Sequence, residues 1–136
     1  MIVVDTNVIC YFYLSSEHSE ITEQLFLKNP IWAAPLLWRS EFRNVLSCHI
    51  RKNIITLQDA TQIFETAETL LTGREYEVNA FQVLKLSQNS GCSAYDCEYV
   101  NLAQDLNVPL ITMDKKILSF FTDTAFSIQQ YMTAFH

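Results

Sequence analysis

Four acidic residues stand where a carboxylate could take part in chemistry, and they are Asp5, Glu41, Asp96 and Asp114. Two follow short apolar runs, one begins a helix pattern and one lies on the apolar side of another helix pattern. Carboxylates that meet in one cleft raise one another's pKa, so such a cluster persists mainly where cations occupy it. Carboxylate and water ligands suit Mg²⁺ or Mn²⁺ rather than zinc, and these ions can activate water against a phosphodiester. The four acids are therefore candidate metal-binding and catalytic residues.

Three of the four acids also have an ordinary structural interpretation. Asp5 and Asp114 are common residue types for a turn or a helix N-cap. Asp96 is the third position of a helix opened by Ser93, which is the place of the acidic partner in a capping box. Each of these residues is ordinary by itself, and only the joint pattern favours a shared site.

Glu41 is more informative because of its place in a helix. At about 100° per residue, a helix over 36–49 places Glu41 on the same arc as Trp38, Phe42 and Val45. The opposite, polar side carries Arg39, Ser40, Arg43 and Ser47. A buried carboxylate is unfavourable unless it is paired, hydrogen-bonded or bound to a metal. Glu41 is thus either a functional carboxylate or a surface residue that bends out to water beside a short apolar stripe.

The elements that position these acids alternate between strands and helices. Short apolar runs predict strands over 1–4, 31–34, 108–112 and 125–128, with a brief extended piece at 76–78. Helical spacing and capping signals predict helices over 16–28, 35–53, 56–71, 79–88, 93–106 and 129–135. Such alternation implies right-handed crossovers. We expect an α/β fold: one three-layer domain over 1–136, with a central parallel sheet and helices on both faces.

The expected sheet places the acids near one edge. Ligands of such sheets bind outside the carboxyl ends of the strands, where the strand order reverses. Asp5 and Asp114 each come just after a strand, and we expect the first strand to be central. We therefore predict one acidic cleft in which the carboxyl carbons of Asp5 and Asp96 lie within about 10 Å, a span that one or two adjacent ions can bridge.

Charge excludes one common means of binding nucleic acid. The net charge is −6 and the pI about 4.9. A broad basic field, which dominates non-specific binding to DNA, is therefore absent. Bound metal ions would have to reverse the local charge at any site for a polyanion.

The cysteines and the apolar segments indicate the compartment. Cys10, Cys48, Cys92 and Cys97 form no CxxC pair and lie in apolar surroundings, which favours buried, reduced thiols. No run approaches the roughly 20 apolar residues that cross a bilayer, and the start MIVVDTN has no signal-peptide features. We expect a cytoplasmic protein without a membrane partner.

In their order along the chain, these segments resemble PIN domains, especially the VapC-type toxins of prokaryotic toxin–antitoxin pairs. The matching segments are MIVVDTN at residues 1–7, PLLWRSEFRNVL at 35–46, YDCEYVNLA at 95–103 and VPLITMD at 108–114. Each is weak alone, but together they are fairly specific and cover nearly the whole chain. The chain departs from the family at Cys97 and Glu98, where small or apolar residues are more usual.

The resemblance implies a function and a set of partners. It implies Mg²⁺- or Mn²⁺-dependent cleavage of single-stranded or structured RNA, a homodimer, and neutralisation by a small antitoxin. The four family acids fall on Asp5, Glu41, Asp96 and Asp114. Thr6, Asn7 and Thr112 occupy the positions of supporting polar residues. Candidates for phosphate contact are Arg39, Arg43, Lys115 and Lys116, although solvated surface charge is the more ordinary role for all four.

Two other functions stay open. One is a non-catalytic RNA-binding or scaffold PIN domain, since a fold does not guarantee an activity. The other is a phosphoryl-transfer domain with Asp5 as nucleophile, for which no matching Lys motif is evident.

For Glu98 we favour a solvent-facing position over an outer ligand. For Tyr11, Phe12 and Tyr13 we favour packing over base stacking, and we assign no catalysis to His18, His49 or His136.

Overall fold

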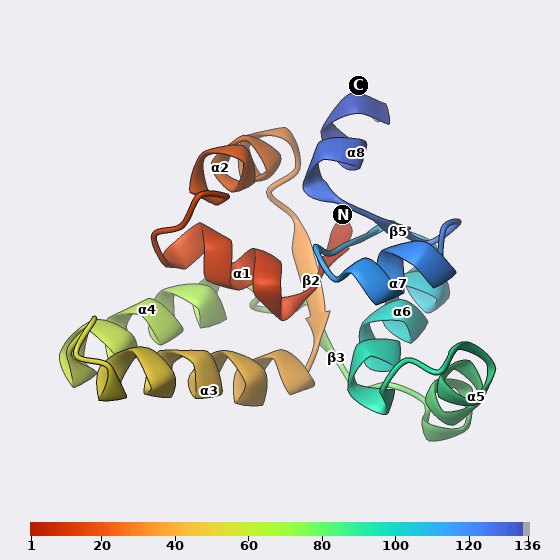
Figure 1. The fold of residues 1–136 in the computed structure, drawn as a ribbon, viewed down its shortest axis with the longest axis horizontal. Helices are drawn as coiled ribbons and strands as arrows, with labels where there is room; N and C mark the ends of the chain where they lie inside the picture. The colour runs from red at the N-terminus through yellow and green to blue at the C-terminus, as the bar shows by residue number, and fades with distance from the viewer. Residues whose placement is uncertain (135–136) are drawn as a thin grey trace.

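The computed structural model describes residues 1–134 (Figure 1). The elements in chain order are β1 (Ile2–Val4), α1 (Thr6–Tyr13), α2 (Ser19–Lys28), β2 (Trp32–Pro35), α3 (Leu37–Arg51), α4 (Leu57–Leu70), β3 (Glu75–Tyr76), α5 (Ala80–Ser90), α6 (Ala94–Leu106), β4 (Leu110–Ile111), α7 (Lys115–Phe120), β5 (Ala125–Phe126) and α8 (Ile128–Ala134). The predicted helix over 129–135 is α8, and its last residue lies outside the described part. No helix among the described residues is long and apolar enough to cross a membrane.

The five strands form one parallel sheet in the order β3-β2-β1-β4-β5. Val3 of β1 pairs with Ala33 of β2 on one side and with Leu110 of β4 on the other. The three residues of β1 are fully buried, as expected for a strand covered on both faces. The prediction of a parallel sheet with β1 at its centre is confirmed.

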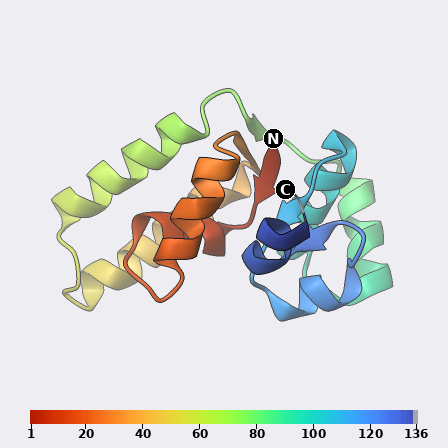
Figure 2. The same ribbon diagram turned by 90° about the horizontal axis from the view of Figure 1, so that it is seen from above.

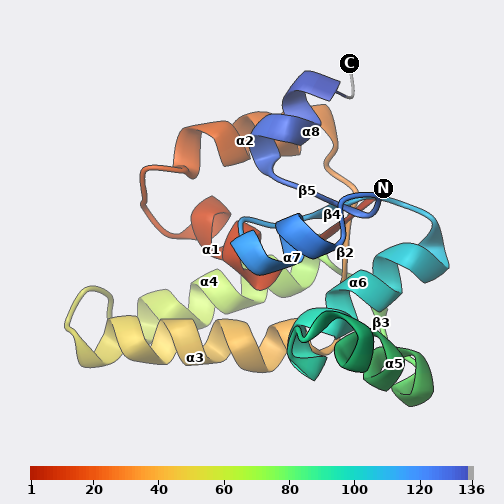
Figure 3. The ribbon, with the colours of Figure 1, turned by 45° about the vertical axis from the view of Figure 1, so that its right-hand side comes forward.

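Helices cover both faces of the sheet. Seen from above, α1 to α4 lie on one side of β1 and β2, and α5 to α7 lie on the other (Figure 2). On the second side α6 packs against the central strands, and α5 lies outside it (Figure 3). The buried apolar side chains of both layers form a single core with the sheet. The predicted α/β class, with helices on both faces, is confirmed.

Several helix starts follow from local capping signals. Thr56 and Asp59 form the predicted capping box at the start of α4. The Asn79 side chain accepts a hydrogen bond from Gln82 N and caps α5. Ser93 caps α6 through a bond from Asp96 N. These predictions are confirmed because a cap depends on residues only two or three positions apart.

Other boundaries were predicted wrongly. α1 was not predicted, because a run of β-branched and aromatic residues is a poor helix former and owes this helix to packing. α2 begins at Ser19 rather than Ser16, whose hydroxyl instead accepts a bond from His18 N in the preceding turn. Pro35 is the last residue of β2 rather than the start of a helix, and α3 begins at Leu37. The strands β4 and β5 are two residues each, shorter than predicted.

The cysteines are free thiols. Cys92 and Cys97 are buried, whereas Cys10 and Cys48 are half-buried. Burial raises the pKa of the Cys10 thiol to about 12, so it stays protonated at neutral pH. Cys92 and Cys97 lie in the core and Cys10 packs against it, as expected, whereas Cys48 is only half-buried.

Candidate active site

Asp5 lies at the carboxyl end of β1 and is also the N-cap of α1. Its Oδ1 accepts a hydrogen bond from Thr6 N at 2.8 Å. Its Oδ2 accepts one from Thr112 Oγ1 at 2.7 Å and a longer one from Asn7 Nδ2 at 3.4 Å. The residue is only 7 % exposed. The capping interpretation of Asp5 is therefore correct, but capping uses only one of its two oxygens.

The surroundings make the charged form of Asp5 unfavourable. Burial raises the pKa of Asp5 to about 7, and the negative charges of Glu41 and Asp96 also raise it. The hydrogen bonds from Thr112 and Thr6 oppose this rise without cancelling it. A bound cation would oppose the repulsion from Glu41 and Asp96 and so favour the charged form of Asp5.

Glu41 is held by two hydroxyl groups from distant elements. Its Oε1 accepts hydrogen bonds from Tyr99 Oη at 2.6 Å and Thr6 Oγ1 at 2.9 Å. These two hydroxyls also lie 2.5 Å from each other. Glu41 thus points inward from α3 and is half-buried, which rules out the alternative that it bends out to water. The fully buried residues Trp38 and Phe42 flank it on the same helix, as the helical pattern predicted.

Asp96 lies in the first turn of α6 and is half-buried. Its backbone N–H donates to Ser93 Oγ at 3.1 Å. Unlike Asp59 in α4, it returns no bond to the backbone of the N-cap residue among the described contacts. Burial raises the pKa of Asp96, and the charges of Asp114 and Glu41 raise it too. A hydrogen bond with the Ser93 side chain and the positive charge of Lys116 lower it in part. The helix start therefore does not depend on the Asp96 carboxylate as a reciprocal cap.

Asp114 follows β4 and caps α7. Its Oδ1 accepts bonds from Lys116 N at 2.9 Å and Ile117 N at 3.0 Å. The buried Thr112 joins it to Asp5, because Thr112 Oγ1 donates to Asp5 and accepts from Asp114 N at 3.0 Å. Asn7 adds a second link, because its Oδ1 accepts a hydrogen bond from Met113 N at 3.3 Å. The ends of the adjacent strands β1 and β4 are thus tied together by side chains.

All four predicted acids line one surface hollow of about 480 Å³. The complete lining is Asp5, Thr6, Asn7, Cys10, Tyr11, Glu41, Asn44, Val45, Asp96 and Asp114. The hollow lies at the carboxyl ends of β1 and β4, where the strand order reverses. The structure therefore brings the four acids to one place from four separate segments, at the predicted edge of the sheet.

The donor set fits a hydrated hard cation better than a dehydrated one. Within residues 1–134, no three His, Cys, Asp or Glu side chains are placed to hold one metal ion directly. Mg²⁺ dehydrates reluctantly and is usually bound through one or two carboxylates and several waters. Carboxylate oxygens in a hollow with room for water suit that mode of binding.

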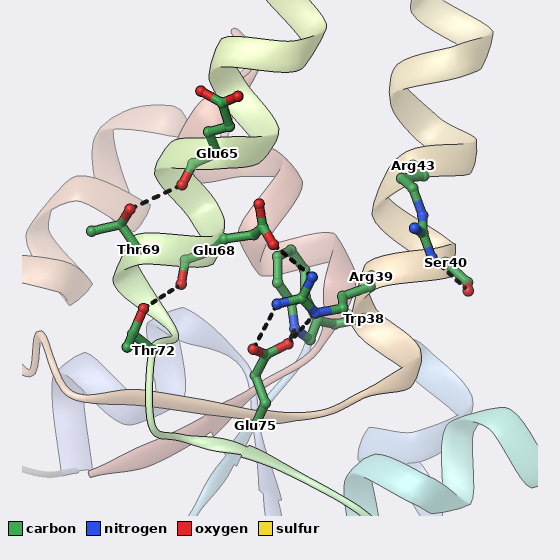
Figure 4. Close-up of polar contacts among 9 residues, drawn as sticks. All are labelled: Trp38, Arg39, Ser40, Arg43, Glu65, Glu68, Thr69, Thr72 and Glu75. Atoms are coloured by element: carbon green, nitrogen blue, oxygen red, sulfur yellow. Dashed lines mark hydrogen bonds and ion pairs between the residues drawn. The ribbon is translucent and has the colours of Figure 1, made fainter.

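Arg39 was a candidate phosphate contact, but it is engaged in a structural network (Figure 4). Its guanidinium binds Glu75 through two nitrogens and Glu68 through a third. Trp38 Nε1 donates to the same Glu75 carboxylate at 2.7 Å. The side chain of Arg39 is only 32 % exposed. Arg39 therefore links α3 to α4 and β3, and it is not the solvated charge that we expected.

The other candidate cations are exposed. Arg43 lies over the Phe64 ring at 5.7 Å and bonds weakly to Ser40. Lys116 Nζ donates to Gly91 O at 2.6 Å. Lys115 and Lys116 directly follow Asp114, which lines the hollow. The two lysines thus carry positive charge next to Asp114 in the sequence.

The aromatic run and Glu98 differ in part from expectation. Phe12 packs with Phe26 and Trp32, as expected. Tyr11 instead lines the hollow and places its ring against His18, with ring centroids 4.6 Å apart. Glu98, expected to face solvent, is half-buried, and burial followed by the charge of Glu41 raises its pKa.

Sequence reasoning missed Tyr99 and Asn44 as site residues. Tyr99 follows Asp96 by three positions, so the two share one face of α6, and this spacing is a usable signal. Its hydroxyl is buried, and burial followed by the charges of Glu41 and Asp5 raises the pKa of Tyr99 far above its usual range. Asn44 follows Glu41 by the same interval on α3.

The fold and the acidic hollow define an α/β protein with carboxylates gathered at a topological switch point. A family model described as PIN domain matches residues 2–125. The chain therefore belongs to the PIN domain family, and the resemblance seen in the sequence is confirmed.

Known proteins of similar sequence and structure are consistent with this assignment. The chain is 27 % identical to ribonuclease VapC3 from Pyrobaculum aerophilum over 124 residues, which cover 88 % of this chain and 94 % of that protein. The crystal structure of PAE2754 from Pyrobaculum aerophilum matches with a TM-score of 0.74 and 19 % identity, covering 98 % of this chain and 94 % of that one. A toxin–antitoxin complex from Klebsiella pneumoniae matches with a TM-score of 0.70 and 15 % identity, over 94 % and 98 %. The two structures share the fold with this chain.

Proposed function

We propose that this protein is a Mg²⁺- or Mn²⁺-dependent endoribonuclease that cuts single-stranded or structured RNA as the toxin of a toxin–antitoxin pair. The observation that carries the proposal is the gathering of Asp5, Glu41, Asp96 and Asp114 in one hollow. Ribonuclease VapC3, a relative along most of the chain, supports the class of substrate. The structural neighbour described as a toxin–antitoxin complex supports the class of partner.

In this proposal Asp5, Glu41, Asp96 and Asp114 would hold the ion, directly or through its water shell. When bound, the ion supplies an activated water and stabilises the charge that develops on the leaving oxygen. The protein's own contribution is orientation. Thr112 and Thr6 N hold the two oxygens of Asp5, and hydroxyl groups hold one oxygen of Glu41.

The proposal also accounts for the acidic charge balance. RNA is a polyanion, and a net charge of −6 does not attract it. Cations in the hollow reverse the local sign, and Lys115 and Lys116 add positive charge beside Asp114. Tyr11, which lines the hollow, would supply a contact for an unpaired base of a single strand.

The proposed partners are a second copy of the chain and a small antitoxin, in the cytoplasm. Large apolar side chains are exposed on α2, α4 and α5, among them Leu27, Leu57, Phe81 and Leu84. Of these, Phe81 and Leu84 lie three positions apart on α5, so they share an exposed apolar helix face that supports association with a partner. Light scattering at micromolar concentration tests the homodimer, and a protein that stays monomeric contradicts it.

The test of the proposed function is Asp96→Asn. The Ser93 cap accepts from the Asp96 backbone, so the helix start survives the exchange. Cleavage of single-stranded RNA in Mn²⁺ should fall by orders of magnitude, because a carboxylate ligand is lost. The rise in melting temperature on adding Mn²⁺ should also be smaller than in the parent. Asp123→Asn is the matched control, since Asp123 is exposed in a turn between α7 and β5.

Each outcome of this test has a meaning. Near-parental cleavage by Asp96→Asn, with an undiminished metal-dependent melting shift, contradicts the assignment. Parent protein that binds RNA without cutting it indicates the non-catalytic alternative. Acid-labile phosphate on Asp5 after exposure to a phosphodonor indicates the phosphoryl-transfer alternative.

A further inference from the structure

We infer that Tyr99 is a positioning residue that holds Glu41 in place for cation binding, through a hydroxyl network joining the three segments that carry Asp5, Glu41 and Asp96. The inference rests on the proposed function for the role of Glu41. It assigns a role to a residue outside the four acids and their supporting polar residues.

Side chains from three separate segments meet at the Tyr99 hydroxyl. Tyr99 Oη lies 2.6 Å from Glu41 Oε1 and 2.5 Å from Thr6 Oγ1. Thr6 Oγ1 lies 2.9 Å from the same Glu41 oxygen. These contacts span 58 and 93 residues of sequence, so only the folded chain assembles them. Glu41 Oε2 has no hydrogen-bond partner among the described residues and is left for the hollow.

Counting hydrogens makes Tyr99 the centre of this network. When Glu41 is ionised, the two hydroxyls supply two hydrogens for three short contacts. Tyr99 donates its hydrogen to Glu41, and Thr6 places its single hydrogen between Glu41 and Tyr99, both of which can accept it. Such a network polarises each bond and strengthens the next. Removing either hydroxyl breaks two of the three contacts, but only removal of the Tyr99 hydroxyl breaks the 2.6 Å bond to Glu41, which is the shorter of the two that Glu41 accepts.

Tyr99 also connects the backbone segments that carry the acids. Thr6 is the first residue of α1 and follows Asp5 directly. Glu41 comes from α3, and Asp96 lies one turn before Tyr99 on α6. One buried hydroxyl thus sets the relative positions of three carboxylate-bearing segments.

Packing alone does not explain a tyrosine at this position. The residue is 1 % exposed, and a phenylalanine ring would fill the same space. A buried hydroxyl is unfavourable unless it is bonded, and this one bonds to a carboxylate that lines the hollow. Groups that orient a metal ligand typically change metal affinity or activity about 10- to 100-fold when they are removed.

The experiment is Tyr99→Phe, which keeps the ring and removes the hydroxyl. Calorimetric titration with Mn²⁺ alone should show affinity weakened about 10-fold or more, and the Mn²⁺ concentration for half-maximal RNA cleavage should rise in parallel. Excess Mn²⁺ should restore part of the cleavage rate. Tyr95→Phe is the control, because Tyr95 lies on the same helix but is 62 % exposed. It should leave Mn²⁺ affinity at the parental value.

A double-mutant cycle in metal-free protein tests whether Tyr99 acts through Glu41. Tyr99→Phe should lower the urea midpoint more in the parent than in a Glu41→Met background, where the hydroxyl loses its carboxylate acceptor and keeps only Thr6. Additive shifts, or equal Mn²⁺ affinities in parent and Tyr99→Phe, overturn the inference. A parent protein that binds Mn²⁺ but cuts no RNA overturns the proposed function and leaves this inference standing. A parent that binds no Mn²⁺ overturns both.

Discussion

The raised pKa of Asp5 predicts how the stability of the metal-free protein depends on pH. The folded state disfavours the charged carboxylate. Below the ordinary Asp5 pKa of 3.8 the residue is protonated in both the folded and the unfolded state, so it does not lower the free energy of unfolding there. The free energy of unfolding should then fall as the pH rises towards about 7, where Asp5 ionises in the folded state. Asp5→Asn removes this pH dependence and keeps a residue that caps helices equally well.

The magnitude follows from the rise of the Asp5 pKa from 3.8 to about 7. Each tenfold change in an acid constant is worth about 1.4 kcal/mol, so ionised Asp5 lowers the free energy of unfolding by about 4 kcal/mol at alkaline pH. Between about pH 5 and about pH 8 the change amounts to about 2–3 kcal/mol. Asp96 also has a raised pKa, but it is present in parent and variant, and its effect largely cancels in the comparison.

The assay is urea unfolding of parent and Asp5→Asn in the presence of a chelator. The stability of the variant relative to the parent should increase by about 2–3 kcal/mol from about pH 5 to about pH 8. Adding Mn²⁺ at the higher pH should stabilise the parent and leave the variant nearly unchanged. A relative stability that does not change with pH would refute the argument that burial makes the Asp5 charge unfavourable.

The remaining predictions concern cations. Arg39→Gln should lower the free energy of unfolding by about 1.5–3 kcal/mol, because it removes hydrogen bonds to Glu75 and Glu68. The rate of RNA cleavage per folded molecule should stay at the parental value. A loss of cleavage with no change in stability in urea would contradict the structural role of Arg39. Lys115→Ala should reduce the salt dependence of single-stranded RNA binding by about 0.7 in the log–log slope. Lys85→Ala, on the outer helix α5, is the control and should leave this slope unchanged. Equal salt-dependence slopes for the two variants in filter-binding assays would contradict a contact between Lys115 and the RNA.

Local sequence signals were sufficient for much of the fold. The apolar run before Asp5 predicted a buried strand, and its central place in a parallel sheet is confirmed. The caps at Thr56, Asn79 and Ser93 were predicted because each bond joins residues three positions apart. The place of Asp5 and Asp114 at one edge follows from parallel topology, since adjacent parallel strands end on the same side.

Predictions failed where distant residues override local preference. α1 forms from residues with modest helix propensity because Val8 and Ile9 are buried in the core. Arg39 looked like a surface charge in the helical pattern. Its acidic partners lie 29 and 36 residues away, and no local signal indicates them.

The candidate site divides in the same way. The sequence by itself singled out the four carboxylates as candidates, because their residue types and their positions at element ends or, for Glu41, on an apolar helix face are local features. Only the tertiary structure decided that Glu41 points inward, that Tyr99 holds it, and that Thr112 joins Asp5 to Asp114. The physical reason is that a pattern of residues records which face of a helix or which end of a strand a side chain occupies. The hydrogen-bond partner of a buried polar group, and with it the pKa, depends on which other element packs against that face.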